Sequence, residues 1–92
     1  MNLMNPYTIP STVLLQCVDE ETLLFNSANG LFFALNETGA MLWEEMTHAT
    51  TLHAVIEQMV EVYDVERKQL EADLIAFSQT LVTQGLLSFE QA

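Results

Sequence analysis

Three short apolar runs in the first part of the chain predict β-strands. Residues 12–18, 22–26 and 31–35 are rich in leucine, valine, phenylalanine and threonine, and each has the length of an ordinary strand. The acidic triplet Asp19-Glu20-Glu21 separates the first two runs, and the third follows Asn29-Gly30. An Asn-Gly pair between apolar runs is the strongest short hairpin signal, because a type I′ turn needs positive φ at both central positions. We therefore expect three antiparallel strands.

The expected Asn29-Gly30 turn also sets the pairing of the second and third strands. With two residues in the turn, Asn26 lies opposite Phe33 and Leu24 lies opposite Leu35. A sheet with one face in water would alternate apolar and polar residues, but here apolar side chains occupy both faces. One face carries Leu24, Leu31, Phe33 and Leu35, and the other carries Leu23, Phe25, Phe32 and Ala34.

The third predicted strand lacks the features that usually protect a sheet edge. Residues 31–35 contain no charged residue and no proline. Three interpretations are open. The chain's own helices or termini cover both faces of the sheet, as small domains often do. Alternatively, an extended peptide adds to the edge as a further strand, or two copies of the chain pair through it.

After residue 35 the hydrophobic period changes from two to about 3.6, which predicts helices. Asn36 can cap a helix that begins near Glu37, and Thr50 or Thr51 can cap a second helix. Asp64 is the expected cap of a third and longer helix. Strands followed by helices define an α+β domain.

Apolar residues at helical spacing form the expected core of this domain. Gly85 suits the left-handed position just beyond the third helix, and residues 86–89 can add a short strand or pack on the core. Residues 1–10 contain both prolines and form an expected extended arm, for which ordering against a partner is one option. Residues 11–92 then make up a single domain. The helical stripes are Met41, Leu42, Trp43 and Met46; Leu52, Val55, Ile56, Met59, Val60 and Tyr63; and Leu70, Leu74, Phe77 and Leu81.

Length and composition agree with one small globular domain. The chain has 92 residues, half of them apolar, and its 13 Asp and Glu against two basic residues give a formal net charge of −11. That charge argues against nucleic acid and against an anionic membrane surface as partners, because both are recognised through basic patches. The sequence contains no signal-peptide pattern and no apolar run long enough to span a bilayer, so we expect a cytoplasmic protein.

The reactive side chains do not form a catalytic or metal-binding pattern. Cys17 is the only cysteine, and its strand parity with Val13 and Leu15 predicts a core position. A nucleophilic cysteine would need a base beside it, and only His48 or His53 could serve. The two histidines straddle a helix start, which is poor geometry for shared metal ligation, and are expected at the surface. We expect no catalytic residue, no metal and no cofactor.

Two motifs in the sequence resemble those of the PqqD-like family. Residues 35–43, Leu-Asn-Glu-Thr-Gly-Ala-Met-Leu-Trp, are similar to the family's LN-x-TG-x-x-hydrophobic-W signature, which opens its first helix. Residues 70–77, followed by Leu81 and Gly85-Leu86-Leu87, are similar to its third helix and its L-x-x-x-GL ending. With the preceding hairpin, the resemblance spans roughly residues 11–89.

The resemblance implies a non-catalytic recognition element for ribosomally made, post-translationally modified peptides. The family's fold resembles a winged helix-turn-helix, with three strands followed by three helices. The leader of a precursor peptide adds to the third strand beside the third helix. The protein then presents it to a modifying enzyme, such as a radical-SAM enzyme or a leader peptidase. Carried onto this chain, the implied peptide-binding residues are Leu31, Phe32, Phe33, Ala34, Leu35, Leu70, Asp73, Leu74, Phe77 and Leu81.

Two other functions stay open beside leader recognition. One is a dimerisation module that uses the edge strand, and the other is a winged-helix transcription regulator, which the acidic charge disfavours. Asp73 lies between Leu70 and Phe77 on the apolar stripe, where a structural role and a contact to the leader are both consistent with its position. Phe32 and Phe33 are equal candidates for the groove. The net charge of −11 predicts a leader or an enzyme with a basic contact surface.

Overall fold

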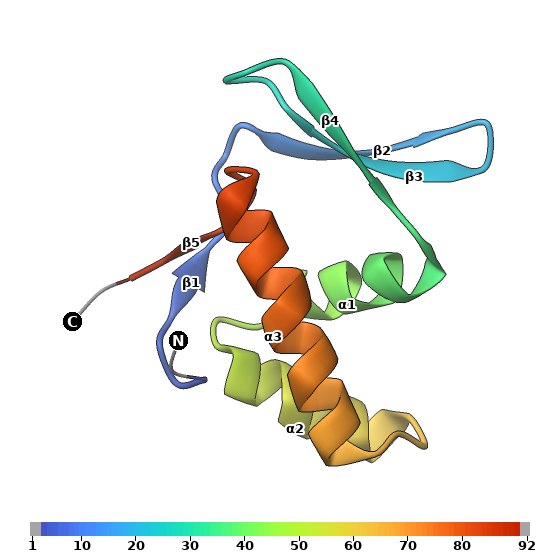
Figure 1. The fold of residues 1–92 in the computed structure, drawn as a ribbon, viewed down its shortest axis with the longest axis vertical. Helices are drawn as coiled ribbons and strands as arrows, with labels where there is room; N and C mark the ends of the chain where they lie inside the picture. The colour runs from blue at the N-terminus through green and yellow to red at the C-terminus, as the bar shows by residue number, and fades with distance from the viewer. Residues whose placement is uncertain (1–2, 91–92) are drawn as a thin grey trace.

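The computed structural model describes residues 3–90 and has an α+β fold. A three-stranded antiparallel sheet in the order β2-β3-β4 forms one end of the molecule, and a short ladder of β1 and β5 lies beside the helices (Figure 1). The predicted three-stranded sheet followed by three helices is confirmed. The elements are β1 (Tyr7–Thr8), β2 (Val13–Val18), β3 (Glu21–Asn26), β4 (Leu31–Leu35), α1 (Glu37–Thr47), α2 (Leu52–Val62), α3 (Arg67–Thr83) and β5 (Ser88–Phe89).

The tight two-residue turn forms in the first hairpin and not in the second. Val18 pairs with Glu21, and the two residues between them, Asp19 and Glu20, have positive φ angles of 49° and 68°. Positive φ at both central positions is the type I′ pattern, whose twist matches that of the flanking strands. A glutamate rarely adopts this backbone, so the pairing of β2 with β3 overrides the local preference of Glu20.

The loop between β3 and β4 has four residues, so the predicted register is wrong by two positions. Asn26 pairs with Leu31, and Leu24 pairs with Phe33. A two-residue turn would have placed Leu24 opposite Leu35.

Asn26 is the physical reason for the longer loop. Its side chain is buried, accepts the N–H of Ala28 at 3.0 Å and donates through Nδ2 to the carbonyl of Gly85 at 3.2 Å. Its carbonyl accepts the N–H groups of Asn29 at 3.3 Å and of Gly30 at 2.8 Å. The contact with Gly85 joins residues 59 positions apart, so the local Asn-Gly signal does not contain it.

A register shift of two residues leaves every side chain on its predicted face. Leu24 and Leu35 are buried in the core, whereas the rings of Phe25 and Phe32 contact each other on the outer face with centroids 4.6 Å apart. Phe32 is 58% exposed. The interpretation in which the chain covers both faces of the sheet is therefore wrong for the outer face within residues 3–90.

The first two helices begin at predicted caps. The Asn36 side chain accepts the N–H of Gly39 at 2.7 Å, and Thr51 Oγ1 accepts the N–H of Ala54 at 3.1 Å. Each cap satisfies one of the backbone donors that a helix leaves free in its first turn. Thr51, rather than Thr50, is the cap of α2.

The start of the third helix differs from the prediction, and its end does not. Asp64 does not cap α3, which begins three residues later at Arg67 after an extended connection from α2. Glu66 occupies the cap position, and its side chain makes no capping hydrogen bond. At the other end Gly85 has φ of 75°, and the Leu86 N–H donates to the Leu81 carbonyl at 2.8 Å, as in a Schellman motif.

The N-terminal arm packs on its own chain at Tyr7 and Thr8. Both residues pair with β5, and the buried Tyr7 hydroxyl donates to the Met46 carbonyl at 2.7 Å. Burial raises the pKa of Tyr7 to about 12. Ordering of this part of the arm therefore needs no partner. The buried core comprises Tyr7, Leu24, Leu35, Leu42, Trp43, Met46, Leu52, Val55, Ile56, Met59, Leu70, Leu74, Leu81, Leu86 and Leu87.

Cys17 is exposed, and its predicted core position is wrong. It lies on β2, the outer strand of the sheet, where Leu15 on the same face is 49% exposed. Strand parity identifies the face correctly, but the core reaches only the start of β2, where Val13 packs against it, and leaves Leu15 and Cys17 exposed.

The part of the chain that the structure describes contains neither a cluster of metal-binding side chains nor a helix that could span a membrane. Within residues 3–90, no three His, Cys, Asp or Glu side chains gather as a metal ion would require. Across the same residues, none of the helices combines the length and the apolar character of a transmembrane span. The His48 ring lies 3.1 Å from the Glu44 carboxylate at the surface.

Candidate functional site

Strand β4 forms an open edge of the three-stranded sheet. Among residues 3–90 it pairs with β3 on one side, and no described segment pairs with its other side. Alternate residues of an edge strand direct their N–H and C=O groups outward, where a further strand can bind them. The five residues of β4, Leu31–Leu35, carry no charge that would oppose such pairing.

A hollow of about 300 Å³, here called the edge groove, lies beside this open edge. It is lined by the end of β4, the start of α1 and the middle of α3. Figure 1 shows how these three elements are arranged. Its apolar wall includes the half-buried rings of Phe33 and Phe77 and the buried Leu35. The edge groove is lined by Phe33, Ala34, Leu35, Asn36, Thr38, Gly39, Leu42, Asp73, Ala76, Phe77 and Thr80.

The Leu35–Gly39 motif shapes the floor of the edge groove. Leu35 enters the core, Asn36 caps α1, and Gly39 lies directly above both. A Cβ atom at Gly39 would stand 3.2 Å from Asn36 Oδ1 and 3.5 Å from both Leu35 Cδ2 and Phe77 Cε1. The absence of a side chain at Gly39 therefore allows the Phe77 ring of α3 to approach the start of α1.

A second hollow of about 270 Å³, here called the acid-rimmed hollow, continues the edge groove toward the start of α3. Thr38, Leu42 and Asp73 line both hollows, so the two are adjacent along α3, and together they are called the channel. The acid-rimmed hollow is lined by Thr38, Met41, Leu42, Met59, Val65, Glu66, Gln69, Leu70 and Asp73.

The structure brings together six of the ten residues predicted for the site. Leu74 and Leu81 are fully buried in the core, so they support α3 and do not reach either hollow. Leu31 and Phe32 are exposed, and neither lines the channel. The predicted residues that line the edge groove are Phe33, Ala34, Leu35, Asp73 and Phe77, and Leu70 and Asp73 line the acid-rimmed hollow.

Several lining residues were absent from the sequence prediction. Ala76 and Thr80 are exposed small residues of α3 that follow Asp73 by three and seven positions, on the same helical face. That helical spacing from Asp73 could have identified both residues from the sequence. The other unpredicted residues of the edge groove come from α1 and its cap, whose position across from α3 is a tertiary property: Asn36, Thr38, Gly39 and Leu42. Those of the acid-rimmed hollow are Met41, Met59, Val65, Glu66 and Gln69, together with Thr38 and Leu42.

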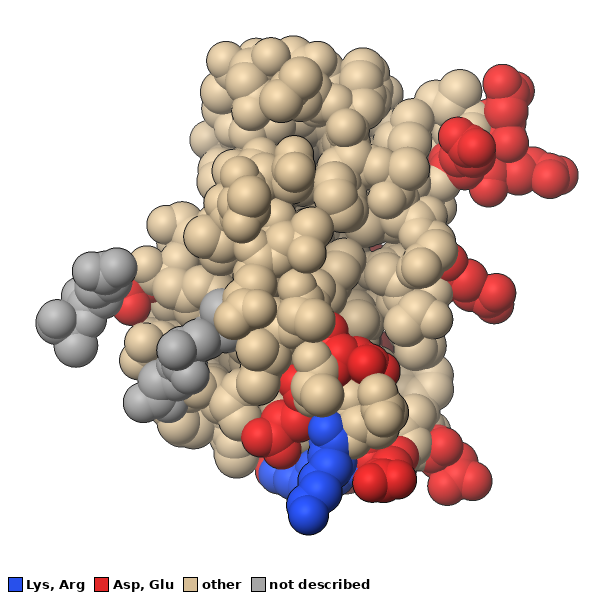
Figure 2. Space-filling view, viewed as in Figure 1, with Lys and Arg blue, Asp and Glu red and all other residues tan. Residues whose placement is uncertain are grey.

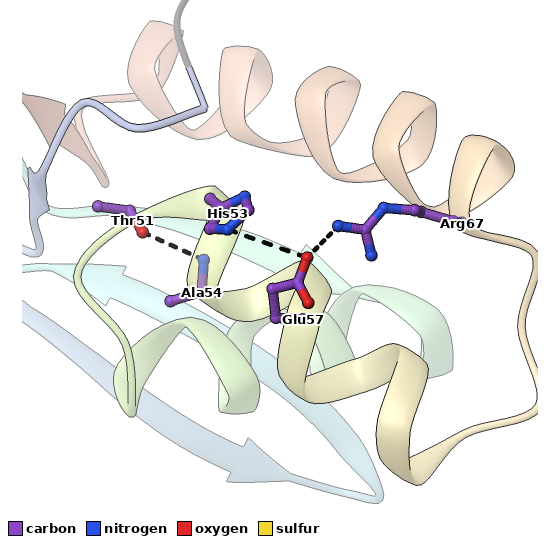
Figure 3. A network of polar contacts seen from close by, with 5 residues as sticks. All are labelled: Thr51, His53, Ala54, Glu57 and Arg67. Carbon is purple, nitrogen blue, oxygen red and sulfur yellow. Dashed lines mark hydrogen bonds and ion pairs between the residues drawn. The ribbon is translucent and has the colours of Figure 1, made fainter.

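Two acidic residues, Glu66 and Asp73, line the acid-rimmed hollow. On the face shown in Figure 2, acidic side chains gather at the bottom, where α2 passes into α3 and the basic residues also lie, and along the right edge up to the tip of the β2–β3 hairpin. Arg67 pairs with Glu57 on α2, which also contacts His53 (Figure 3). The hydrogen bond from Arg67 lowers the pKa of the Glu57 carboxyl.

A larger depression of about 950 Å³ lies at the far end of α3, between that helix, the N-terminal arm and β5. Its strand, β5, is only two residues long, against five for β4. Size alone therefore does not make it the better peptide site, because strand addition depends on the number of backbone hydrogen bonds available.

Comparison with known proteins identifies the family. The family model described as coenzyme PQQ synthesis protein D (PqqD) matches residues 21–87, which include β3, β4, the three helices and the residues that line both hollows. The chain belongs to the PqqD family. No curated protein matches this PqqD-family chain.

Two solved structures have the same fold as this PqqD-family chain. One is described as TbiB1 in complex with the TbiA(beta) leader peptide; it is 24% identical, with a TM-score of 0.76 over 92% of this chain and 99% of that one. The other is a lasso peptide synthetase B1 complexed with the leader peptide; it is 21% identical, with a TM-score of 0.73 over 89% of this chain and 96% of that one. Their similarity in shape confirms the α+β architecture.

Proposed function

We propose that this protein binds the leader segment of a ribosomally made precursor peptide, as a strand added to β4, and performs no catalysis itself. One observation carries the proposal: the open edge of β4 lies directly beside the edge groove. A ladder of backbone hydrogen bonds would supply affinity, and the groove between Phe33 and Phe77 would supply side-chain selectivity.

The family and the fold support the same function. PqqD-family membership covers residues 21–87, and the two structures of the same fold were each solved with a leader peptide. We propose that the bound leader is then presented to a modifying enzyme in the cytoplasm, with a radical-SAM enzyme or a leader peptidase as candidates. The net charge of −11 favours a basic contact surface on that enzyme or on the leader.

An amide-resolved NMR titration tests the proposal. The probe is a synthetic peptide that corresponds to the leader part of the short precursor-like reading frame nearest to the gene. We expect chemical-shift changes at residues 31–35 and along the channel side of α3, and slower hydrogen exchange of the outward β4 amides. Changes confined to the far end of α3 and β5 would contradict strand addition.

Two alanines of α3 provide a matched pair of variants. Ala76 lines the edge groove, whereas Ala72, one turn earlier and also exposed, lines neither hollow. Ala76→Arg places a long side chain in the groove and is expected to weaken binding at least about tenfold, which is about 1.4 kcal/mol. Ala72→Arg changes the net charge equally and should leave the affinity unchanged. Equal effects of the two substitutions would place the peptide elsewhere.

A peptide with N-methylated backbone amides separates strand addition from side-chain docking alone. Methylation removes the donors that a ladder with β4 needs and leaves the side chains intact. We expect the methylated peptide to lose most of its affinity for the wild-type protein. Undiminished binding would show that the leader occupies the groove without pairing to β4.

Self-association is a second candidate function, and the outer sheet face favours it. Leu14, Val18 and Phe32 on that face are each about half exposed or more. Two copies could cover these residues by stacking their sheets or by pairing their edge strands. Light scattering of the free protein measures this directly, and a monomeric mass across the working concentration range would remove it.

A further inference from the structure

The acid-rimmed hollow combines an apolar floor with two carboxylates at its mouth. Glu66 and Asp73 line it and are both exposed at the surface of α3. They stand two helical turns apart, a distance of about 10 Å along the helix axis. The floor between them is formed by Met41, Leu42, Met59 and Leu70.

Among the described residues, no lysine or arginine lines this hollow. Arg67 pairs with Glu57 on the α2 side (Figure 3), and neither Arg67 nor Lys68 lines the hollow. Asp73 accepts a hydrogen bond at 2.8 Å from Gln69 Nε2, which is a neutral donor. Within residues 3–90, the hollow therefore presents negative charge above an apolar floor.

We propose that the acid-rimmed hollow is the subsite for a lysine or arginine side chain of the bound leader, a proposal that rests on the leader binding proposed above. Such a side chain has an aliphatic stem that covers apolar surface and a cationic head that stays at the rim. The floor suits the stem, and the carboxylates of Glu66 and Asp73 suit the head. A leucine or methionine would fill the floor but leave the carboxylates unpaired, and an acidic residue would be repelled.

The adjacency of the two hollows sets the position of this basic residue in the leader. The α3 residues of the edge groove run from Asp73 to Thr80, and those of the acid-rimmed hollow run from Glu66 to Asp73. This offset of seven helical positions is about 10 Å, and an extended peptide advances about 3.3 Å per residue. The basic residue therefore follows or precedes the apolar residue in the edge groove by about three positions.

Selection from a phage-displayed library of random peptides tests this subsite even while the natural leader is unidentified. The target is the full chain, and the selected peptides are synthesised and mapped by NMR. We expect enrichment of a lysine or arginine about three residues from an apolar residue. Replacing that basic residue with norleucine, which keeps the stem and removes the charge, should weaken binding about fivefold.

Carboxylate variants identify the partner of the selected cation. Asp73→Asn retains an acceptor for Gln69 and removes the charge, so the fold is preserved. It should weaken binding of the lysine peptide more than binding of the norleucine peptide, and a double-mutant cycle measures this difference. Glu71→Gln is the control, because Glu71 lies on α3 outside both hollows.

The outcomes separate the subsite from the proposed function. Two outcomes would overturn the subsite and leave leader binding intact. In the first, selected peptides perturb residues 31–35 but show no preference for a basic residue. In the second, such peptides bind with unchanged affinity to Asp73→Asn and to Glu66→Gln. Peptides that perturb only other surfaces, or a selection without enrichment, would overturn both. Loss of affinity in Glu71→Gln equal to that in Asp73→Asn would assign the effect to net charge and overturn the subsite.

Discussion

Strands β2 and β4 flank the same central strand, but they differ in what lies beside them. β4 has the start of α1 and the middle of α3 next to it, so its edge opens onto the edge groove. β2 lines none of the three hollows described above, and Leu14 and Leu15, on its opposite faces, are 50% and 49% exposed. Both edges offer backbone hydrogen bonds, but of the two strands it is β4 that lines a hollow described above. An open edge alone therefore makes no selective site.

Packing energetics give the largest expected difference between the two edges. Leu35 of β4 is buried in the core, whereas Leu15 of β2 is half exposed. Leu35→Ala should lower the free energy of unfolding by about 2–5 kcal/mol, because it leaves a cavity. Leu15→Ala should cost less than about 1 kcal/mol. Urea unfolding measures both, and equal losses would show that β2 is as well supported as β4.

The next largest expected difference between the β4 and β2 edges is in their effect on the affinity for the leader peptide. Phe77→Glu places a charge in the edge groove and is expected to weaken leader binding more than about tenfold, or about 1.4 kcal/mol. Leu15→Glu adds the same charge on β2 and should leave the affinity unchanged. Isothermal titration calorimetry measures both, with circular dichroism to verify the fold. Intact binding in a folded Phe77→Glu protein would contradict the position of the groove.

The dependence of stability on alkaline pH tests how α1 supports β4. The Tyr7 hydroxyl donates a hydrogen bond to the Met46 carbonyl near the end of α1. Burial raises the pKa of Tyr7 from 10.0 to about 12, so the folded state favours the neutral phenol. The stability that this provides is complete below pH 10 and is lost as the pH rises toward 12.

The Tyr7→Phe variant isolates this contribution. It removes the hydrogen bond to the Met46 carbonyl and should cost about 1 kcal/mol at neutral pH. The same substitution should flatten the decline in stability between pH 10 and pH 12, measured by urea unfolding at a series of pH values. An equally steep decline in the variant would assign the alkaline loss to other groups.

The smallest expected effect is a gain in stability from a substitution in α3, the helix that lines the edge groove opposite β4. Ser78 of α3 is fully buried, and its hydroxyl has no hydrogen-bond partner in the described structure. Ser78→Ala removes an unsatisfied polar group and should raise the free energy of unfolding by about 1 kcal/mol. Thermal unfolding measures the change, and Ser88→Ala at an exposed position of β5 serves as a neutral control. A loss of stability would indicate a buried water at the hydroxyl.

Much of the fold could be predicted because its signals are local. Asn36 and Thr51 cap their helices through bonds to residues three positions away, and Gly85 ends α3 through its own left-handed backbone. The predictions that failed depend on distant partners. The β3–β4 loop is built around an Asn26 contact to Gly85, and Cys17 is exposed because the core reaches Val13 at the start of β2 and not Cys17 near its end.

The candidate site shows the same division. The uncharged β4 edge and the apolar positions of α3 were visible as patterns along the chain. Periodicity could not show that Leu74 and Leu81 face the core while Asp73 and Phe77 face the channel, because all four lie near one stripe. Which side of α3 is covered depends on where α1 and α2 pack.

The amino-acid sequence by itself determined the order of strands and helices, two of the three helix caps, the acidic charge and the resemblance to the PqqD family. Those properties come from neighbours a few residues apart or from composition. Only the tertiary structure decided that Phe33, rather than Phe32, lines the edge groove, and that Glu66 and Asp73 share a second hollow. The physical reason is that each hollow lies between segments far apart in the chain, and its shape exists only once they are packed.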